Sequence, residues 1–512
     1  MEPVHLCGSG PRSARTSARM FGMNTLVGGK VGLALSLVIG LAACGDSSGR
    51  TSDSATGATS QTTTDPSSTG STSAPTTSAS ASDSASSGSA TNGMTMGTTE
   101  PTSTSDGTAT GSTGGSTGVI GTTGTTGGGT TGGGGSTTGE PPPCMPGDGM
   151  GMGMAEKSYI FIPSQDLDDV AKVNTQTLVL EARYKIGPGG ESASRTAVSG
   201  DGRYVVVNNR QTGRSTMLAA NKEDCVDKNG NGMIDTSQNA NDVKPWGQDE
   251  CVLWNIQWPY GGQWHQGPRG ITWTPGEWSV DECKYINPKV WLGYMSQDGV
   301  TVHLVRVAVD GTVEETIPVP NWNGSGFSPY GGALDPEFRP WFSSLRGEFV
   351  RVNTDQNPIT IDRFTPPGNV QSYGFSVDPD GHPWFGGNCG PITKYDTDTQ
   401  QYIFIPGTEN GCWRGVGADE NYVWVANNSP CQLAQVDRIN HTLVANHNTN
   451  PCSTAIGISV DIEKFVWLVD QEGWAWKIDP MNVPAMKQVM VPGSHYVYSD
   501  MTGGQLQSIL PQ

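Results

Sequence analysis

The stretch CVDKNGNGMID, residues 225–235, carries oxygen-bearing side chains at the alternating positions of a calcium-binding loop. Such loops surround the cation with alternating Asp and Asn side chains, one backbone carbonyl and a further side-chain oxygen. The sequence therefore predicts a structural calcium site formed by Asp227, Asn229, Asn231, the carbonyl of Met233, and Asp235.

The loop departs from the full calcium pattern at its end. Gln238 stands where a bidentate acidic residue usually closes the coordination sphere. Asp242 is a candidate substitute, and no helix pair flanks the segment. The alternative interpretation is a metal-free turn rich in Asn and Gly.

The beginning of the chain has the features of a bacterial lipoprotein leader. Basic residues precede an apolar run, residues 31–43, which is short for a membrane-spanning helix and ends in small residues. The ending Leu41-Ala42-Ala43-Cys44 resembles a lipobox, in which the cysteine is lipidated and becomes the mature N-terminus. We expect residues 1–43 to be the signal peptide and Cys44 the lipidation site; the alternative is an ordinary cleaved signal peptide.

Residues 44–155 are dominated by Ser, Thr and Gly. Such a segment buries too little apolar surface to offset its ordering entropy, so we expect a disordered tether. The domain that follows would then be held at the bacterial cell envelope, facing the periplasm or the cell surface, with the membrane contacted through the lipid anchor only. The formal charge of −19 argues against a nucleic-acid partner.

Residues 156–512 repeat a short apolar strand that contains a tryptophan. The interval is 40 to 50 residues, which in an all-β chain is typical of four-stranded propeller blades. Strands that begin at Tyr159 and Tyr204 add two earlier copies, provided that an insertion of about residues 221–252 is set aside. The remaining copies contain Trp291, Trp341, Trp384, Trp424 and Trp467.

The first and last segments of this domain complete one another. The first blade, from Ser158, lacks its innermost strand, whereas His495–Gly503 reads as a strand without a blade. Joining them closes the ring and removes free sheet edges. The predicted fold class is all-β: a seven-bladed β-propeller closed by its N- and C-terminal strands and preceded by the tether. An open β-sandwich would not explain the regular spacing.

The blades resemble those of the streptogramin B lyase (virginiamycin B lyase) group. The resemblance covers about residues 158–512 and rests on Gly-led innermost strands, the Asp-Pro-Asp-Gly turn at 378–381, and Trp-Phe at 341–342 and 384–385. It implies a seven-bladed propeller and, if there is catalysis, a metal-assisted carbon–oxygen lyase. The Thr-Glu that follows Trp-Phe in that group is replaced by Ser-Ser and Gly-Gly, and no catalytic motif transfers residue by residue.

Propellers usually bind ligands at the end of the channel where the innermost strands begin. Aligning the repeats places a ring of largely cationic and aromatic residues there: His495, Arg195, Arg269, Tyr330, Tyr373, Arg414 and Ile456. Arginine favours anions and stacks on aromatic rings. The ends of the second strands add Asn208, Asn388, Asn427 and Asp470. We expect a site for a polar or anionic ligand; the alternative is that these groups pair with one another and with channel water.

The cysteines support this alignment. Equivalent loops of consecutive blades predict the disulfides Cys389–Cys412 and Cys431–Cys452, both at the mouth of the channel. Cys225 and Cys251 would close the neck of the insertion, although Cys283 is an alternative partner.

The main hypothesis is a surface-tethered lipoprotein whose propeller binds a polar or anionic ligand, such as a glycan, or an envelope protein. The runner-up is a lyase-like or hydrolase-like enzyme with His495 as general base. A third interpretation is an envelope scaffold without a small ligand.

Overall fold

The computed structural model describes residues 144–146, 158–368 and 370–510. The expected signal peptide (residues 1–43), Cys44 and nearly all of the tether (44–155) lie outside the described residues. Within the described ranges, no helix has the length and apolar character needed to cross a membrane.

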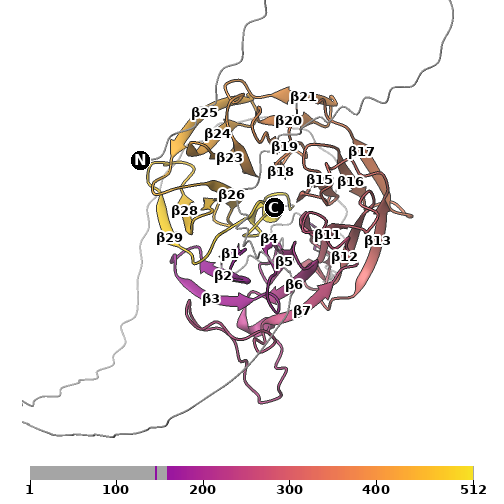
Figure 1. Cartoon of the computed structure of the whole chain (residues 1–512), viewed down its shortest axis with the longest axis vertical. Coiled ribbons are helices and arrows are strands. Elements are labelled where there is room, and N and C mark those ends of the chain that lie inside the picture. The colour runs from indigo at the N-terminus through magenta and orange to yellow at the C-terminus, as the bar shows by residue number, and fades with distance from the viewer. Residues whose placement is uncertain (1–143, 147–157, 369, 511–512) are drawn as a thin grey trace, which may run out of the picture. The chain divides into compact units, whose positions relative to one another are not determined.

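Seven antiparallel sheets follow one another around a central axis, as the progression of colours in Figure 1 shows. The first sheet has three strands and the other six have four. In each sheet the strands are hydrogen-bonded in chain order, with the first strand of a four-stranded blade nearest the axis. The expectation of a seven-bladed propeller is confirmed.

The first blade consists of β1 (Tyr159–Ser164), β2 (Asp169–Asn174) and β3 (Leu180–Lys185). The second consists of β4 (Ala193–Val198), β5 (Tyr204–Asn209), β6 (Arg214–Ala219) and β7 (Val252–Gln257). The third consists of β8 (Ile271–Thr274), β11 (Lys289–Met295), β12 (Val302–Val307) and β13 (Val313–Val319). A hairpin between β8 and β11 consists of β9 (Glu277–Ser279) and β10 (Lys284–Ile286).

The fourth blade consists of β14 (Gly331–Leu334), β15 (Pro340–Ser343), β16 (Phe349–Asn353) and β17 (Thr360–Phe364). The fifth consists of β18 (Gly374–Val377), β19 (Pro383–Gly386), β20 (Thr393–Asp396) and β21 (Gln401–Phe404). The last two are formed by β22 (Trp413–Ala418), β23 (Tyr422–Asn428), β24 (Cys431–Asp437) and β25 (Thr442–Asn448), and by β26 (Ala455–Val460), β27 (Val466–Asp470), β28 (Trp474–Ile478) and β29 (Lys487–Met490).

The C-terminal segment closes the ring beside β1. The amide of Gln165 donates to the carbonyl of Ser494 at 2.8 Å, and the amide of Phe161 donates to the carbonyl of Met501 at 3.0 Å. Ser164 and His495 form an isolated antiparallel bridge. The segment therefore takes the place of the missing innermost strand, although it pairs at separate points and not along a continuous ladder.

The short helix α1 (Gly504–Ser508) follows this segment and covers the end of the channel where the innermost strands finish. Leu506 belongs to the same apolar cluster as Ile271 and Trp273, and the Gln505 amide donates to the Ser376 hydroxyl at 2.9 Å. Figure 1 accordingly shows the end of the described chain, in yellow, near the centre of the ring. The opposite end, where the innermost strands begin, is called the mouth below.

A repeated contact between Asp and Trp explains why the tryptophan recurs. In the fourth to seventh blades, an Asp after the innermost strand accepts a hydrogen bond from the indole Nε1 of the buried Trp on the second strand, at 2.6 to 2.9 Å. The other carboxylate oxygen accepts backbone amides of the intervening turn, as Asp378 does from Asp380 and His382. One side chain thus fixes both the turn and the core packing. The pairs are Asp335–Trp341, Asp378–Trp384, Asp419–Trp424 and Asp461–Trp467.

The insertion joins β6 to β7 at the end of the blade opposite the mouth, and Figure 1 shows it projecting beyond β7. It begins with a short 3-10 helix, Lys222–Asp224, and a Cys225–Cys251 disulfide closes its neck. Cys283, the alternative partner of Cys225, is instead bonded to Cys144.

Replacing Asp378 with Ala is expected to lower the free energy of unfolding by about 2–4 kcal/mol. The change leaves the Trp384 indole and two turn amides without their acceptor in a buried site. Chemical denaturation of the purified protein measures the effect. Asp355, which is exposed, provides the control: Asp355→Ala should change stability by less than about 0.5 kcal/mol. Equal effects of the two substitutions would contradict the role given to Asp378.

Candidate functional site

The mouth of the channel brings together all three arginines and both tyrosines predicted from the repeats. The ring centroids of Tyr330 and Tyr373 are 5.2 Å apart. The guanidinium of Arg195 lies 4.8 Å from the centre of the Tyr330 ring, and that of Arg269 lies 5.5 Å from it. Arg414 lies 4.5 Å from the centre of the Tyr373 ring. These residues form one connected cluster.

Local irregularities in the innermost strands help to direct these side chains. The pairing of β4 with β5 shifts register next to Arg195, and the pairing of β22 with β23 shifts register across Arg414. A similar shift in β26 occurs at Ile456. A β-bulge bends the strand and re-aims side chains, so equivalent positions of the blades do not present their side chains identically.

Four tyrosines fill the channel beneath the arginines. The hydroxyls of Tyr330 and Tyr373 both hydrogen-bond to that of Tyr496, the second at 3.0 Å. Tyr498 donates to the Tyr373 hydroxyl at 3.0 Å. Tyr496 and Tyr498 belong to the C-terminal closing segment, so their contacts with Tyr330 and Tyr373 link that segment to the fourth and fifth blades across the channel.

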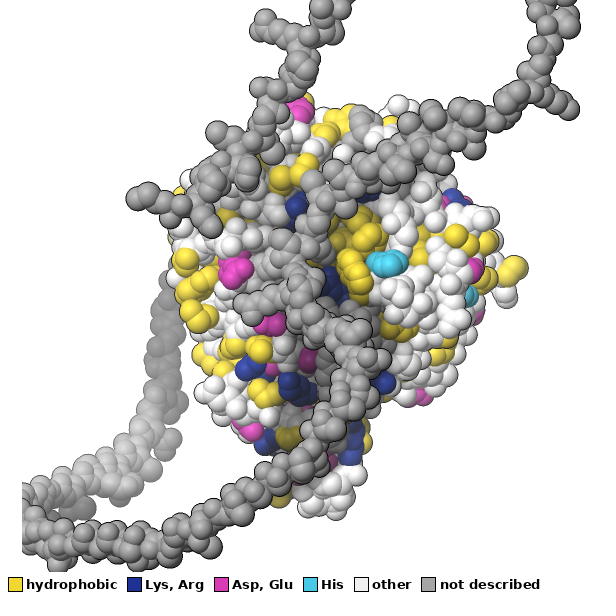
Figure 2. All heavy atoms as spheres, viewed as in Figure 1, with side chains coloured by type: hydrophobic (Ala, Val, Ile, Leu, Met, Phe, Trp, Pro, Cys, Tyr) yellow, Lys and Arg dark blue, Asp and Glu magenta, His cyan; other side chains and the backbone are white. Residues whose placement is uncertain are grey.

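Arg210, which follows β5, joins Arg195 and Arg269 in a compact group that we call the arginine triad. Each pair of the triad shares one aromatic partner within 5.6 Å of both guanidinium carbons. The shared rings are Tyr496 for Arg195 and Arg210, Trp264 for Arg210 and Arg269, and Tyr330 for Arg195 and Arg269. Cation–π contacts of this kind offset part of the free energy needed to bury the guanidinium groups. Figure 2 shows basic and hydrophobic side chains next to one another near the centre of the face in view.

The triad is buried without a carboxylate partner among the described residues. Arg195 and Arg269 are 0% exposed and Arg210 is 5% exposed. None of the ion pairs in the described part of the chain involves any of the three. Burial, together with the charges of Arg210 and Arg195, lowers the pKa of Arg269 to about 10. Its guanidinium remains charged near neutral pH.

Several N–H groups of the triad also lack hydrogen-bond acceptors within the described ranges: Nη2 of Arg195, Nη1 of Arg210, and Nε and Nη1 of Arg269. The remaining guanidinium nitrogens are used. Arg195 donates to the carbonyls of Ser194 and Tyr330, and Arg269 donates to the carbonyl of Trp264. Buried donors without acceptors are unfavourable, so the triad holds open donors together with uncompensated positive charge.

Carboxylates on the neighbouring loops bind backbone amides and hydroxyls. Asp166 accepts from the amide of Ser494 at 2.7 Å. Asp168 accepts from the amides of Gly190 and Glu191 at 2.8 and 2.7 Å. Glu191 itself accepts from the Thr212 hydroxyl. These acidic groups shape the loops around the mouth and form no ion pair with the triad.

An aromatic rim adjoins the triad on the loops that precede β8 and β14. Trp264 is 36% exposed, and its ring lies edge-on to Phe327 and His265, with centroids 5.5 and 5.8 Å away. Burial, followed by the charge of Arg269, lowers the pKa of His265. The mouth therefore combines an exposed aromatic surface with open cationic donors.

The structure lends no support to His495, the candidate general base of the enzyme hypothesis. His495 is 0% exposed, and its ring nitrogens lie 3.0 and 3.1 Å from the carbonyls of Pro163 and Val491. Burial lowers its pKa. Since a general base must reach the proton that it removes, His495 serves to hold the closing segment against β1.

Three further predicted ligand residues are buried and support loops. Asn208 donates to the carbonyl of Arg269 at 3.0 Å and accepts from Ser215. Asn427 accepts the amides of Cys412 and Ser429, and Asp470 accepts those of Ser453 and Thr454. Asn388 differs, because its side-chain oxygen accepts from Arg414 at 2.8 Å. It positions a mouth arginine directly.

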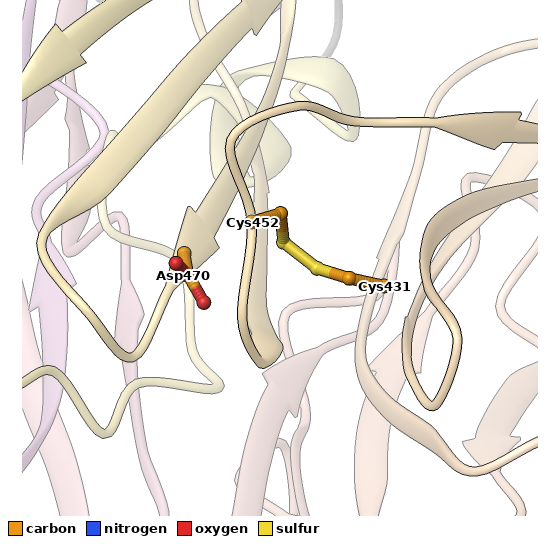
Figure 3. Close-up of side chains that lie close together, drawn as sticks. All are labelled: Cys431, Cys452 and Asp470. Atoms are coloured by element: carbon orange, nitrogen blue, oxygen red, sulfur yellow. A yellow bond between two sulfur atoms is a disulfide. The ribbon is translucent and has the colours of Figure 1, made fainter. Parts of the chain in front are cut away.

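The two cysteine pairs predicted at the mouth are brought together. Cys431 and Cys452 form a disulfide, with Asp470 beside it (Figure 3). Although these three residues lie close enough to suggest a metal site, the disulfide occupies both sulfurs. The thiols of Cys389 and Cys412 form a hydrogen-bond contact of 3.2 Å and are not joined as a disulfide.

The repeat alignment missed Arg210, Tyr496, Tyr498, Trp264 and Phe327. A signal for the tyrosines was present in HYVYSD, because alternate residues of an extended strand share one face. The face that carries Tyr496 and Tyr498 is the one that points into the channel. Arg210 and the aromatic rim lie on loops, where repeat spacing does not predict the direction of a side chain.

The calcium-like loop is held together by its own polar groups. The Asp227 carboxylate accepts the amides of Gly230 and Gly232 at 2.6 and 2.8 Å. The side-chain NH₂ groups of Asn229 and Asn231 both donate to the same carboxylate oxygen of Asp235, each at 2.9 Å. The side chains of Asn229, Asn231 and Asp235 therefore meet within the loop.

Glu250, which was not predicted from the sequence, joins the two ends of this loop through hydrogen bonds. Its buried carboxylate accepts the backbone amides of Lys228, Asn229 and Asp235. Asp242, the candidate substitute, instead accepts the Gln238 amide and pairs with Lys244.

Replacing Arg269 with Met is expected to leave the free energy of unfolding unchanged or to raise it by up to about 2 kcal/mol. The substitution removes a buried charge that has no ion-pair partner in the described part of the chain, and it keeps an apolar chain for packing. Denaturant unfolding of the purified protein provides the measurement.

The matched control is Arg363→Met. Arg363 forms two hydrogen bonds of 2.7 Å with the buried carboxylate of Glu348, so its loss should cost about 1–3 kcal/mol. If Arg269→Met destabilises as strongly as Arg363→Met, then Arg269 has a structural role.

The proteins that this chain resembles are solved structures of low sequence identity. No family model and no curated protein matches the chain. Virginiamycin B lyase from Staphylococcus aureus is 15% identical, with a TM-score of 0.45, over 62% of this chain and 90% of that one. AztD from Citrobacter koseri is 11% identical, with a TM-score of 0.42, over 67% and 97%. A protein from Lactobacillus plantarum is 14% identical, with a TM-score of 0.45, over 67% and 98%. Similarity at this level concerns the propeller fold and carries no inference about activity.

Proposed function

We propose that the propeller is a binding domain whose mouth captures a ligand with an anionic group. The observation that carries the proposal is the arginine triad, which is buried, has open N–H donors and forms no ion pair within the described residues. A bound anion would supply the missing charge and acceptors together. Charge-assisted hydrogen bonds from guanidinium to an oxyanion are among the strong ones.

The surroundings of the triad support binding over a purely structural role. Arginines that serve structure in this protein pair with acids, as Arg363 does with Glu348 and Arg438 with Asp378 and Asp380. The triad lies at the end of the channel opposite α1. The aromatic rim next to it offers an apolar surface to the rest of a ligand.

The expected attachment of this domain to the bacterial envelope is part of the proposal. Its support is the leader that ends in Leu41-Ala42-Ala43-Cys44 and the polar segment that follows. A lipidated Cys44 would keep the mouth at the envelope, where a polar ligand, a glycan or an envelope protein can reach it.

The binding proposal predicts that an anionic compound will stabilise the purified protein. A panel of small carboxylates, sulfates and phosphates can be screened by thermal shift, and the affinity of the compounds that respond can be measured by calorimetry. Arg195→Met and Arg269→Met should each weaken binding by about 30-fold or more, because they remove one member of a buried charged contact.

Arg203→Met is the control for this experiment, because Arg203 lies in the turn before β5 at the far end of the blade, with its side chain 49% exposed. The Arg203→Met variant should bind the anionic compound with the same affinity as the wild type. If no compound binds, or if the triad variants bind as well as the wild type, the proposal fails.

We also propose that the loop of residues 227–235 holds a structural calcium ion. The support is the convergence of Asp227, Asn229, Asn231 and Asp235, with Glu250 fixing both ends of the loop. The ion would draw on these side-chain oxygens and on the Met233 carbonyl. Because the loop lies opposite the mouth, calcium would stabilise the insertion and take no part in anion binding.

Removing calcium with a chelator is then expected to lower stability without changing the affinity for the anion. With 1 mM calcium and a dissociation constant of roughly 10 µM, the ion would stabilise the protein by about 2.7 kcal/mol. Asp227→Ala should abolish the difference in stability with and without calcium, and Asp242→Ala should retain it. A chelator that weakens anion binding but leaves stability unchanged would contradict this assignment.

A further inference from the structure

We propose that the anionic group recognised at the mouth is the doubly charged phosphate of a phosphate monoester, whose organic part lies on the aromatic rim. This inference rests on the binding function proposed above and names the class of ligand. Its basis is the number of guanidinium groups, their shared geometry and the open donors.

The charge of the triad favours a dianion. Three guanidinium groups lie close enough to share aromatic partners pairwise, and none has an ion-pair partner within the described residues. A carboxylate carries one negative charge and would leave most of the positive charge uncompensated. A phosphate monoester carries about 1.5–2 negative charges near neutral pH.

The number of donors points the same way. Open N–H groups come from all three members of the triad: Arg195, Arg210 and Arg269. A carboxylate has two oxygens and matches the fork of a single guanidinium, whereas a phosphate monoester presents three terminal oxygens to separate donors. Three arginines around one phosphate can therefore each find an acceptor.

The aromatic rim favours ligands whose phosphate is attached to an apolar group. The Arg269 guanidinium lies 5.1 Å from the centre of the Trp264 ring, which is partly exposed and flanked by Phe327. A ring or apolar face attached to the phosphate can lie against Trp264 while the phosphate reaches the triad. The site thus selects for an ester over free inorganic phosphate.

The test uses three probes with one ring and different anionic groups: phenyl phosphate, phenyl sulfate and benzoate. Calorimetry on the purified full chain at pH 7.5 should give phenyl phosphate an affinity at least tenfold higher than that of the other two. Trp264→Ala should lower the affinity for phenyl phosphate about tenfold and leave the affinity for inorganic phosphate nearly unchanged. Arg210→Gln should reduce the preference for phosphate over sulfate.

The pH dependence gives a second readout. The second pKa of a phosphate monoester lies near 6, so the preference for phenyl phosphate should shrink about tenfold between pH 7.5 and pH 5. Phenyl sulfate keeps its single charge over this range, so it corrects for changes in the protein. The titratable groups beside the triad are Tyr330, Tyr496 and His265. Of these and the three arginines, His265 alone ordinarily titrates in this window.

The outcomes separate the two proposals. If benzoate or phenyl sulfate binds as tightly as phenyl phosphate at pH 7.5, the phosphate assignment is overturned and anion binding stands. If none of the probes and no inorganic phosphate binds, both fail. A Trp264→Ala variant that loses phenyl phosphate and inorganic phosphate equally would show that the rim does not hold the organic part.

Discussion

The pairing of the C-terminal segment with β1 is the contact on which the rest of the ring depends. Without it, the first blade would have three strands and an exposed edge towards the channel. The same segment brings Tyr496 and Tyr498 into the channel, where their hydroxyls join those of Tyr330 and Tyr373. Closing the ring and building the floor of the mouth are therefore one event, and His495 contributes by fixing the start of the segment.

The distribution of carboxylates explains why positive charge stays uncompensated in so acidic a protein. Acidic side chains outnumber basic ones, 49 to 30, yet many of them are bound to backbone amides in turns. Asp335, Asp378, Asp419 and Asp461 hold the turns after innermost strands. Asp166 and Asp168 do the same beside the mouth. The acidic side chains thus bind nearby backbone amides, and within the described residues the arginine triad has no carboxylate partner.

This separation gives the two ends of the propeller different physical roles. The end with α1 and the insertion is closed by apolar packing, disulfides and polar loops. The mouth keeps buried arginines that packing alone would not favour. Buried charges of this kind lower the stability of the folded protein. Their donors are, however, already oriented before a ligand arrives and need little reorganisation on binding. The tyrosine floor and Asn388 provide that orientation.

Much of the architecture follows from local sequence patterns. The spacing of the tryptophans, the Asp-containing turns and the unpaired first and last segments together predict a closed ring of seven blades. The first two patterns reflect a contact that recurs in four blades, and the third reflects a free edge that must be paired. The positions of Arg195, Arg269, Arg414, Tyr330 and Tyr373 at the mouth also follow, since they begin equivalent strands.

Tertiary structure decided the direction and partners of individual side chains. Register shifts next to Arg195 and across Arg414 are not visible in the spacing, and the loops that carry Arg210 and Trp264 have no repeat to align. His495 occupies the expected position in the ring, yet its side chain turns to backbone carbonyls. Period and composition determine which strand a residue joins, whereas burial and the competition for hydrogen-bond partners determine whether it can meet a ligand.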